Sequence, residues 1–447
     1  MIAALIWSSI TLASPADDDH RAGMTAQRAG DAKIALSSYQ SCLEKDPNHV
    51  ACHWEIGWSY WTLNDWEEVV QHWNRVKVLA PDHPEVDAHL PTALGHLENL
   101  RRIRDGAKSA PKTVRTQAPT DWSIRIRAVG DIMMGTDFPH PTDYLPPDDG
   151  DALFSGVETL LRDADLTFGN LEGPLCDGGT TNKCSEGANC YAFRTPTRYA
   201  RHLVSAGFDM VSTANNHAED FGATCRTQTE QTLQANAISF SGRPGTIATQ
   251  TVRGRKIALI GFHTSRNSHY VNDHETARAL VASLAQSHDL VIVSFHGGAE
   301  GNKALHVPQG NETFYGENRG DLRTFTRILV EAGADVIFGH GPHVPRGLQL
   351  IDGRLVAYSL GNFATYGRFG LGGHLSTSLI LDVELDGEGR LIHGQIHPIT
   401  LQGKGVPVKD SEGTAIDLIR SLSTEDFGTS APLIGQDGSF APAPPEP

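Results

Sequence analysis

The stretch Ala334-Asp-Val-Ile-Phe-Gly-His-Gly-Pro-His343 decides the fold of this chain. Its short apolar run, Val-Ile-Phe, predicts a buried strand that stops at Gly339. His340 and His343 follow directly, and the glycines and proline around them predict a tight turn. Both imidazoles are therefore expected at one rim of a sheet.

Other apolar runs also end in residues of the types that bind metal ions. They are 124–129, 165–168, 208–213 and 290–295, followed by Asp131, Glu172, Asn216 and His296 respectively. Helical patterns at 195–206 and 322–332 separate some of them, and 355–360 and 375–385 predict antiparallel strands. Alternating strands and helices with polar strand ends predict an α/β sheet whose functional site lies along that edge.

Length and composition fit a large core with a smaller module. The chain has 447 residues, of which 39% are hydrophobic and 20% charged, so most of it is expected to be globular. The formal net charge of −16 argues against a nucleic-acid-binding surface. It does not exclude an anionic substrate, because a bound metal ion reverses the local field.

The first residues predict export from the cytoplasm. Residues 1–16, MIAALIWSSITLASPA, combine a short apolar run with small residues, as in a secretory signal, although Lys and Arg are absent before the run. A retained N-terminal anchor is the alternative. No later apolar stretch approaches the roughly 20 residues that span a bilayer. We therefore expect a protein of the periplasm, cell envelope or exterior.

Six cysteines fall into two groups, which are Cys42 with Cys52, and Cys176, Cys184, Cys190 and Cys225. The larger group could hold zinc, but it lacks a CxxC pair, so disulfides are the favoured interpretation. Four cysteines allow three connectivities, which the sequence does not separate. The smaller group would cross-link two successive helices.

Residues 20–104 predict a helical-repeat module. Equivalent positions lie 34 residues apart, and these pairs are Gly23 and Gly57, Ala35 and Val69, Tyr39 and Trp73, and Pro47 and Pro81. The pattern resembles the tetratricopeptide repeat, a helix–turn–helix unit of that period. Two repeats offer little binding surface, so packing is the favoured role for the tryptophans here.

Composition sets the remaining boundaries. Residues 105–122 are rich in Arg, Lys, Pro and Thr and predict a linker. The main domain is expected over 123–427. Residues 428–447 decay into Gly, Pro and Ala and predict a disordered tail.

The polar strand ends together form a set of metal ligands. The candidates are Asp131, Glu172, Asn216, His296, His340 and His343. Taken singly, each has an ordinary structural explanation, such as a turn, a cap or a buried histidine. Five separate strand ends that all finish in such residues favour a metal centre.

These motifs resemble the CapA family of capsule-synthesis and poly-γ-glutamate-associated proteins, which look like relatives of the calcineurin-type metallophosphoesterases. The resemblance spans roughly residues 126–365. It is carried by GDIMMG (130–135), NLEGPL (170–175), AGFDMVSTANNHAEDFG (206–222), VIVSFHGGAE (291–300), GADVIFGHGPHV (333–344) and VAYSLGNF (356–363). It implies a metallophosphoesterase-like β-sandwich flanked by helices, with a metal centre at its edge.

The resemblance also implies how the candidate ligands divide between two ions. Glu172 would bridge both, Asn216, His296 and His340 would complete one site, and Asp131 and His343 would bind the other ion. The first strand carries Met133 where phosphoesterases usually have a histidine, and a thioether is a poor ligand for a hard ion. We therefore expect one or two divalent ions, with Zn, Mn and Fe as possible identities.

Further residues receive roles only from the resemblance. His217 would act as a general acid toward a leaving group. Asp220 and Glu300 would orient the imidazoles. Arg194 and Asn362 are weaker candidates for substrate contact, with packing as an equal alternative.

Two functions follow as hypotheses. The first is a metal-dependent hydrolase that cleaves a phosphoester or a γ-glutamyl polymer outside the cytoplasm. The second is a non-catalytic assembly factor for an extracellular polymer, with the helical repeats docking an envelope protein. A degenerate fold with structural metal alone is the third possibility, and family likeness does not fix the bond cleaved.

Overall fold

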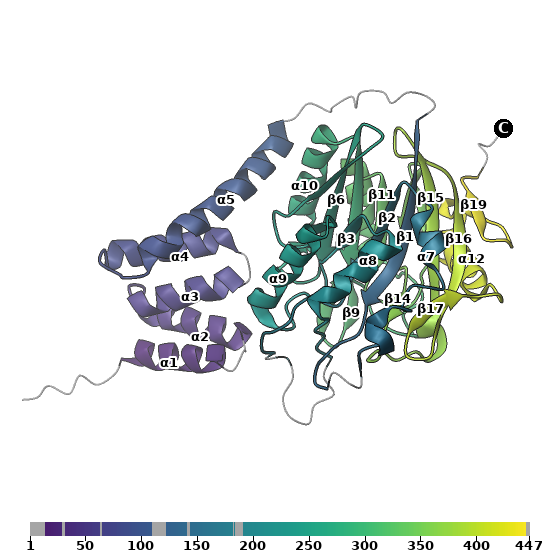
Figure 1. The fold of residues 1–447 in the computed structure, drawn as a ribbon. Coiled ribbons are helices and arrows are strands. Elements are labelled where there is room, and N and C mark those ends of the chain that lie inside the picture. Colours follow the sequence, from purple (N-terminus) through teal and green to yellow (C-terminus); the bar gives the residue numbers. More distant parts are fainter. Residues whose placement is uncertain are drawn as a thin grey trace, which may run out of the picture. The chain divides into compact units, whose positions relative to one another are not determined.

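A computed structural model describes the chain over residues 14–28, 32–62, 65–109, 122–140, 144–181, 183 and 191–443. The chain divides into two compact units between Arg102 and Ile103 (Figure 1). Most of the expected signal, residues 1–13, lies outside the described residues, and Pro15 begins the first helix. Within the described part, no helix is long and apolar enough to cross a membrane.

The smaller unit consists of helices. They are α1 (Pro15–Arg28), α2 (Ala32–Lys45), α3 (Val50–Thr62), α4 (Trp66–Leu79) and α5 (Val86–Ser109). A Cβ atom at Gly23 would overlap the Tyr39 ring, and one at Gly57 would overlap the Trp73 ring. The same glycine–aromatic contact therefore recurs after 34 residues, as a repeat requires. Assignment to the tetratricopeptide class remains a prediction.

The disulfide between Cys42 and Cys52 joins α2 to α3, as the sequence suggested. The linker prediction is wrong at its start, because α5 runs through residue 104 to Ser109. The rest of the predicted linker, 110–121, lies outside the described residues.

The larger unit contains two mixed sheets. The first has the order β18-β19-β16-β15-β1-β2-β3-β4, with β14 beside β1 and β17 beside β16, and the second has the order β12-β13-β11-β8-β6-β5, with β7 beside β6. The first comprises β1 (Ser123–Met133), β2 (Leu166–Leu171), β3 (Met210–Ser212), β4 (Ser239–Ser241), β14 (Asn362–Thr365), β15 (Thr377–Asp386), β16 (Leu391–Gln402), β17 (Val406–Lys409), β18 (Leu433–Ile434) and β19 (Ser439–Ala441). The second comprises β5 (Ala248–Val252), β6 (Arg255–His263), β7 (His269–Tyr270), β8 (Leu290–His296), β11 (Val336–His340), β12 (Leu348–Ile351) and β13 (Arg354–Ala357).

The main core lies between these two sheets. Ile126 and Phe168 of the first sheet belong to one buried cluster with Ile292 and Phe338 of the second. The rings of Phe168 and Phe338 stack at a centroid distance of 5.5 Å. Alternate residues of β1 face this core, which is the pattern of a strand in a sheet sandwich.

Helices cover the outer faces of both sheets (Figure 1). Leu161, Leu203 and Leu233 of three helices pack on the first sheet, and Leu280 and Phe325 of two others pack on the second. These helices are α7 (Glu158–Arg162), α8 (Ala200–Ala206), α9 (Gly222–Ala235), α10 (His274–Ser287) and α11 (Leu322–Ala332). The predicted class, an α/β sandwich flanked by helices after an all-α module, is confirmed.

Two local predictions are wrong. The strand of the opening motif does not stop at Gly339, because β11 continues to His340. Gly339 is required there for another reason: a Cβ atom would overlap the carbonyl oxygen of Tyr358. The tail is also ordered through residue 443, where β18 and β19 follow α12 (Thr414–Phe427) and Phe440 is 2% exposed.

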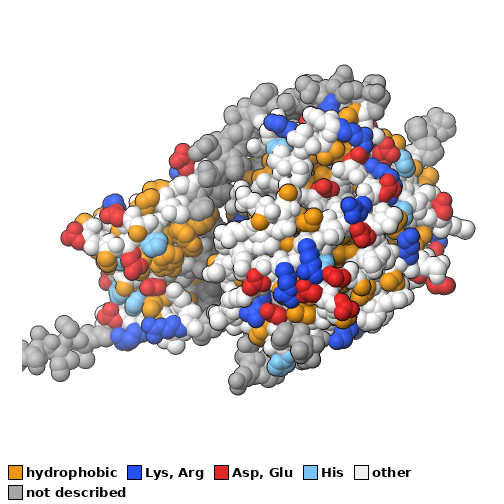
Figure 2. Space-filling view, in the orientation of Figure 1, with side chains coloured by type: hydrophobic (Ala, Val, Ile, Leu, Met, Phe, Trp, Pro, Cys, Tyr) orange, Lys and Arg blue, Asp and Glu red, His pale blue; other side chains and the backbone are white. Residues whose placement is uncertain are grey.

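The surface of the large unit mixes both signs of charge. Figure 2 shows acidic and basic side chains interspersed on the face in view. Ion pairs join neighbouring elements of this unit, such as Arg198 with Asp149 at 2.7 Å and Arg201 with Asp151 at 2.9 Å. The net negative charge is therefore not gathered into one acidic patch on this face.

Gly130 allows β1 and the segment before β14 to approach closely. A Cβ atom at Gly130 would overlap the carbonyl oxygen of Gly361, which accepts the backbone N–H of Asp131 at 2.9 Å. We expect Gly130→Ala to lower the free energy of unfolding by about 3 kcal/mol, because backbone atoms must move. Urea unfolding measures this free energy. Gly370→Ala, where a Cβ meets open space, is the control and should change it by less than about 0.5 kcal/mol. Equal effects would contradict the packing argument.

His269 predicts a dependence of stability on pH. Its Nδ1 lies 3.0 Å from the carbonyl oxygen of Gly261, and its Nε2 accepts the N–H of Gly245 at 2.8 Å, so the folded state requires a neutral imidazole. Burial lowers the pKa of His269 to about 4. The stability it contributes is complete above pH ~6.5 and is lost as the pH falls toward 4.

His269→Gln removes this titration. Between pH 6.5 and 4 the wild type should lose about 3 kcal/mol more unfolding free energy than the variant, measured by urea unfolding at each pH. Parallel pH profiles for the two proteins would refute the assignment.

Candidate metal centre

Strand ends from both sheets meet at one edge of the sandwich. Asp131 on β1 pairs in register with Asn170 on β2, and His340 on β11 pairs with His296 on β8. Glu172 follows β2 directly, and its N–H donates to the carbonyl oxygen of Ile132. The side chains of the two carboxylates and two histidines are fully buried. The sheet register therefore brings these groups together.

Three side chains offer ligand atoms to one point. One ligand atom each from Asp131, Glu172 and His296 lies within 4.8 Å of the others. His296 Nε2 is 3.3 Å from Glu172 Oε1. His340 Nδ1 is 3.3 Å from Asp131 Oδ1, and His343 Nδ1 is 2.8 Å from Asp131 Oδ2. All five residues expected at this edge as carboxylate or imidazole ligands are thus in one cluster.

The two carboxyl groups have pKa values that shift in opposite directions. Burial favours the neutral form of Asp131, but contacts with His340 and His343 outweigh it and hold its pKa well below the usual range. Burial and the charge of Asp131 raise the pKa of Glu172. For His343, the bond to Asp131 outweighs burial and raises its pKa to about 9. In the metal-free protein, Asp131 and His343 therefore form an ion pair.

Several buried polar atoms at the centre lack a partner. Among the described residues, neither ring nitrogen of His340 has a hydrogen bond, nor do Nδ1 of His296 and Oδ1 of Asn362. Leaving such an atom unsatisfied costs roughly 1–3 kcal/mol, so these atoms mark where a ligand fits. Carboxylate oxygen and imidazole nitrogen suit divalent ions such as Zn, Mn or Fe. The residues present thus fit a divalent metal ion.

The asparagine prediction in the loop after β3 requires correction. Asn216 is exposed, whereas its neighbour Asn215 is fully buried. Asn215 Nδ2 donates to Leu171 O at 2.9 Å and lies 3.2 Å from Asn170 Oδ1. The turn therefore directs the side-chain amide of Asn215, and not that of Asn216, into the centre.

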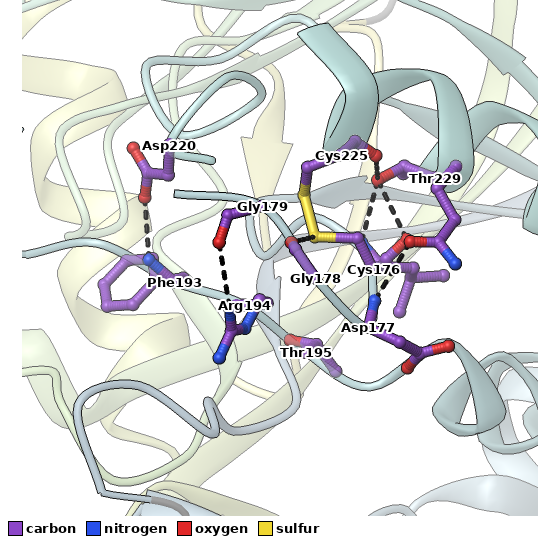
Figure 3. Close-up of a disulfide and its surroundings, with 12 residues drawn as sticks. Cys176, Asp177, Gly178, Gly179, Phe193, Arg194, Thr195, Asp220, Cys225 and Thr229 are labelled. Atoms are coloured by element: carbon purple, nitrogen blue, oxygen red, sulfur yellow. Dashed lines mark hydrogen bonds between the residues drawn. A yellow bond between two sulfur atoms is a disulfide. The ribbon is translucent and has the colours of Figure 1, made fainter. Parts of the chain in front are cut away.

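His217 lies beside the cluster and is held by Asp220. His217 Nδ1 is 2.7 Å from Asp220 Oδ2, and His217 Nε2 is 3.9 Å from Glu172 Oε1. Asp220 also accepts the backbone N–H of Phe193 at 2.8 Å, as Figure 3 shows. Lys183 Nζ lies 2.8 Å from Asp220 Oδ1. The imidazole therefore has one nitrogen fixed and the other directed toward the carboxylates.

A disulfide braces the segment that carries Phe193. Cys176 is bonded to Cys225 of α9, and Thr229 one turn later bonds the backbone N–H and carbonyl of Leu175 (Figure 3). This confirms disulfide chemistry for two of the clustered cysteines. Cys184 and Cys190 lie outside the described residues.

The other expected residues lie near the centre with different partners. Glu300 pairs with Arg319 at 2.9 Å, and its expected role in orienting an imidazole stays a prediction. Arg194 pairs with Asp137 at 2.7 Å, which fits packing. Asn362 is the register partner of Asp131 and donates to the carbonyl of Leu375.

His263 was missed by the sequence analysis. It ends β6 in register with His296, and the two rings meet edge to face at 5.3 Å. Its strand, Arg255–His263, has the same apolar run followed by a histidine as β8, so the signal was present. Asn170 and Asn215 were not among the predicted ligands either.

The fold and the site define a class of protein, an α/β sandwich with a buried carboxylate–imidazole centre at the sheet edge. The chain belongs to the family described as bacterial capsule synthesis protein PGA_cap, whose family model matches residues 125–366. This confirms the family resemblance carried by the motifs.

The individual relatives share less than 30% sequence identity with this chain. PGA biosynthesis protein CapA of Bacillus subtilis (strain 168) is 28% identical over 270 residues, covering 56% of this chain and 66% of that protein. Capsule biosynthesis protein CapA of Bacillus anthracis is 27% identical over 257 residues, covering 54% and 59%. The match thus spans less than two thirds of either relative. A solved purple acid phosphatase, PPD1 from yellow lupin (Lupinus luteus), is 10% identical with a TM-score of 0.32 and covers 66% of this chain and 55% of that one.

The ion pair of Asp131 and His343 can be tested without metal. In Asp131→Asn, His343 loses both the charge-assisted hydrogen bond and the negative charge of Asp131 that raise its pKa, so its pKa should fall clearly from about 9. An NMR titration of the imidazole in chelator-treated protein measures it. Asp417→Asn, at an exposed position of α12, is the control and should leave the pKa of His343 unchanged. A variant that still titrates near 9 would show that another group holds the proton.

Proposed function

We propose that this chain is an exported, metal-dependent hydrolase in the synthesis or processing of a capsule or other extracellular polymer of the poly-γ-glutamate type. The observation that carries the proposal is the convergence of Asp131, Glu172 and His296, with His217 beside them. The two relatives named for PGA and capsule biosynthesis support the biological setting. The two disulfides support an oxidising compartment.

Asp131, Glu172, His296, His340 and His343 would hold one or two divalent ions. When bound, such an ion supplies Lewis acidity, which polarises a phosphoryl or carbonyl oxygen and makes a water molecule more acidic. Asn216 is no longer part of this proposed set, because its side chain is exposed.

His217 would donate a proton from Nε2 to the leaving atom. Its Nδ1–H donates to Asp220 at 2.7 Å, which directs Nε2 toward the carboxylates, so the donating form is the doubly protonated imidazolium with a second proton on Nε2. Asp220 is therefore a positioning residue in this proposal. Lys183, whose side chain is 40% exposed, adds a positive charge next to this pair and favours an anionic substrate, either a phosphoester or a γ-glutamyl polymer.

The test starts with metal content and turnover. Purified protein should contain at least one tightly bound divalent ion per chain by mass spectrometry, and it should hydrolyse phosphodiesters or γ-glutamyl polymer in a metal-dependent way. His217→Ala should lower kcat by about 10²–10⁴-fold, because general acid catalysis is lost, while metal content is kept. His393→Ala, an exposed histidine on β16, serves as the matched control and should retain full activity.

Protein with less than one ion per chain and no metal-dependent turnover on either substrate class would reject the proposal. Equal activity of the His217 and His393 variants would reject the role of His217 alone.

The separate helical unit favours a second candidate function. This unit has its own buried clusters, one around Trp54, Trp73 and Leu90 and one around Tyr39 and Cys42. It could dock an envelope protein while the centre binds polymer without turnover. Deleting residues 20–104 and, separately, changing His217→Ala while measuring capsule production separates the two: capsule lost only on the deletion supports docking, and capsule lost with His217→Ala supports catalysis.

A further inference from the structure

One amide group lies between the two buried carboxylates. Asn170 Nδ2 donates to Asp131 Oδ1 at 2.8 Å and to Glu172 Oε2 at 2.6 Å. All three side chains are fully buried. An amide nitrogen has two protons, so both are used, one by each carboxylate.

The contacts divide each carboxylate into two functionally different oxygens. On Asp131, Oδ1 accepts from Asn170 and also lies 3.3 Å from His340 Nδ1, whereas Oδ2 faces His343 at 2.8 Å. On Glu172, Oε2 is bonded to Asn170 and Oε1 faces His296 at 3.3 Å. The single amide thus fixes the direction in which the second oxygen of each acid points.

The orientation of this amide is itself fixed. Asn170 Oδ1 lies 3.2 Å from Asn215 Nδ2, which also donates to Leu171 O. Asn215 Oδ1 accepts the backbone N–H of His217 at 3.1 Å. A reversed Asn170 amide would place its carbonyl oxygen against two carboxylates, so the observed orientation is the only favourable one.

We propose that Asn170 is the positioning residue of the centre. It holds Asp131 and Glu172 at a fixed separation and orientation, and Asn215 links it to the backbone of His217. The inference rests on the proposed function in one respect, which is that Asp131 and Glu172 are metal ligands. Two buried carboxylates this close repel one another, and a shared donor offsets that repulsion without adding charge.

The test replaces Asn170 with Leu, which keeps the branching of the side chain but has no polar atoms. Asn170→Leu removes both donors and adds no charge. Titration calorimetry with Mn²⁺ or Zn²⁺ should show metal affinity about 10–100-fold weaker than in the wild type, with an unchanged circular dichroism spectrum. Asn236→Leu, at the partly buried C-terminal end of α9, is the control and should bind metal like the wild type. Wild-type affinity in Asn170→Leu would overturn the proposal.

A metal-free measurement tests Asn170 independently of the proposed function. Asn170→Asp replaces both donors with a third carboxylate. In chelator-treated protein, Tm should therefore fall in the order wild type, Asn170→Leu, Asn170→Asp. A role in packing alone predicts the larger loss for Asn170→Leu, because Asp keeps the size and shape of Asn whereas Leu is bulkier, and that result would overturn the proposal. A wild type that binds no ion would instead reject the metal-dependent function and leave this order to decide the role of Asn170.

Discussion

Two carboxylates from neighbouring strands lie fully buried at the edge where the two sheets meet, and the rest of the centre depends on keeping them there. A buried charge is costly unless it is paired and hydrogen-bonded. The structure meets this requirement for Asp131 with the imidazole of His343 and the amide of Asn170. These partners come from β2 and from the loop after β11. The register of strands in both sheets is therefore a condition for the site, not just for the core.

The strand-end pattern predicted much of this arrangement. Apolar runs that end in Asp131, His296 and His340 were assigned correctly to one edge, because parallel strands of alternating α/β segments place their carboxyl ends together. The strand-end pattern does not distinguish between two adjacent asparagines. Asn215 is buried and Asn216 is exposed, because the conformation of the turn after β3 determines which amide faces inward. His263 was missed because β6, which carries it, was not recognised as a strand.

Composition gave a wrong prediction at the C-terminal end of the large unit. The Gly- and Pro-rich tail looks disordered, yet Phe440 is buried against Gly394, where the absence of a side chain leaves room for its ring. Only the tertiary neighbour reveals this, since Gly394 lies on β16, far away in sequence. In the same way, only the structure pairs Cys176 with Cys225 of α9, a connectivity that sequence alone does not determine.

Met133 occupies the position where phosphoesterases usually have a histidine, and in this chain His343 supplies an imidazole to the centre. Met133 is buried and its Sδ accepts the backbone N–H of Gly135 at 3.3 Å, so this side chain supports the turn after β1. The centre instead receives a donor from His343, which adopts a left-handed backbone conformation with a φ of 59°. That conformation costs a non-glycine residue roughly 1–2 kcal/mol. The ion pair with Asp131 offsets this cost and also neutralises the buried carboxylate. One contact therefore supports both the strained turn and the charge at the centre.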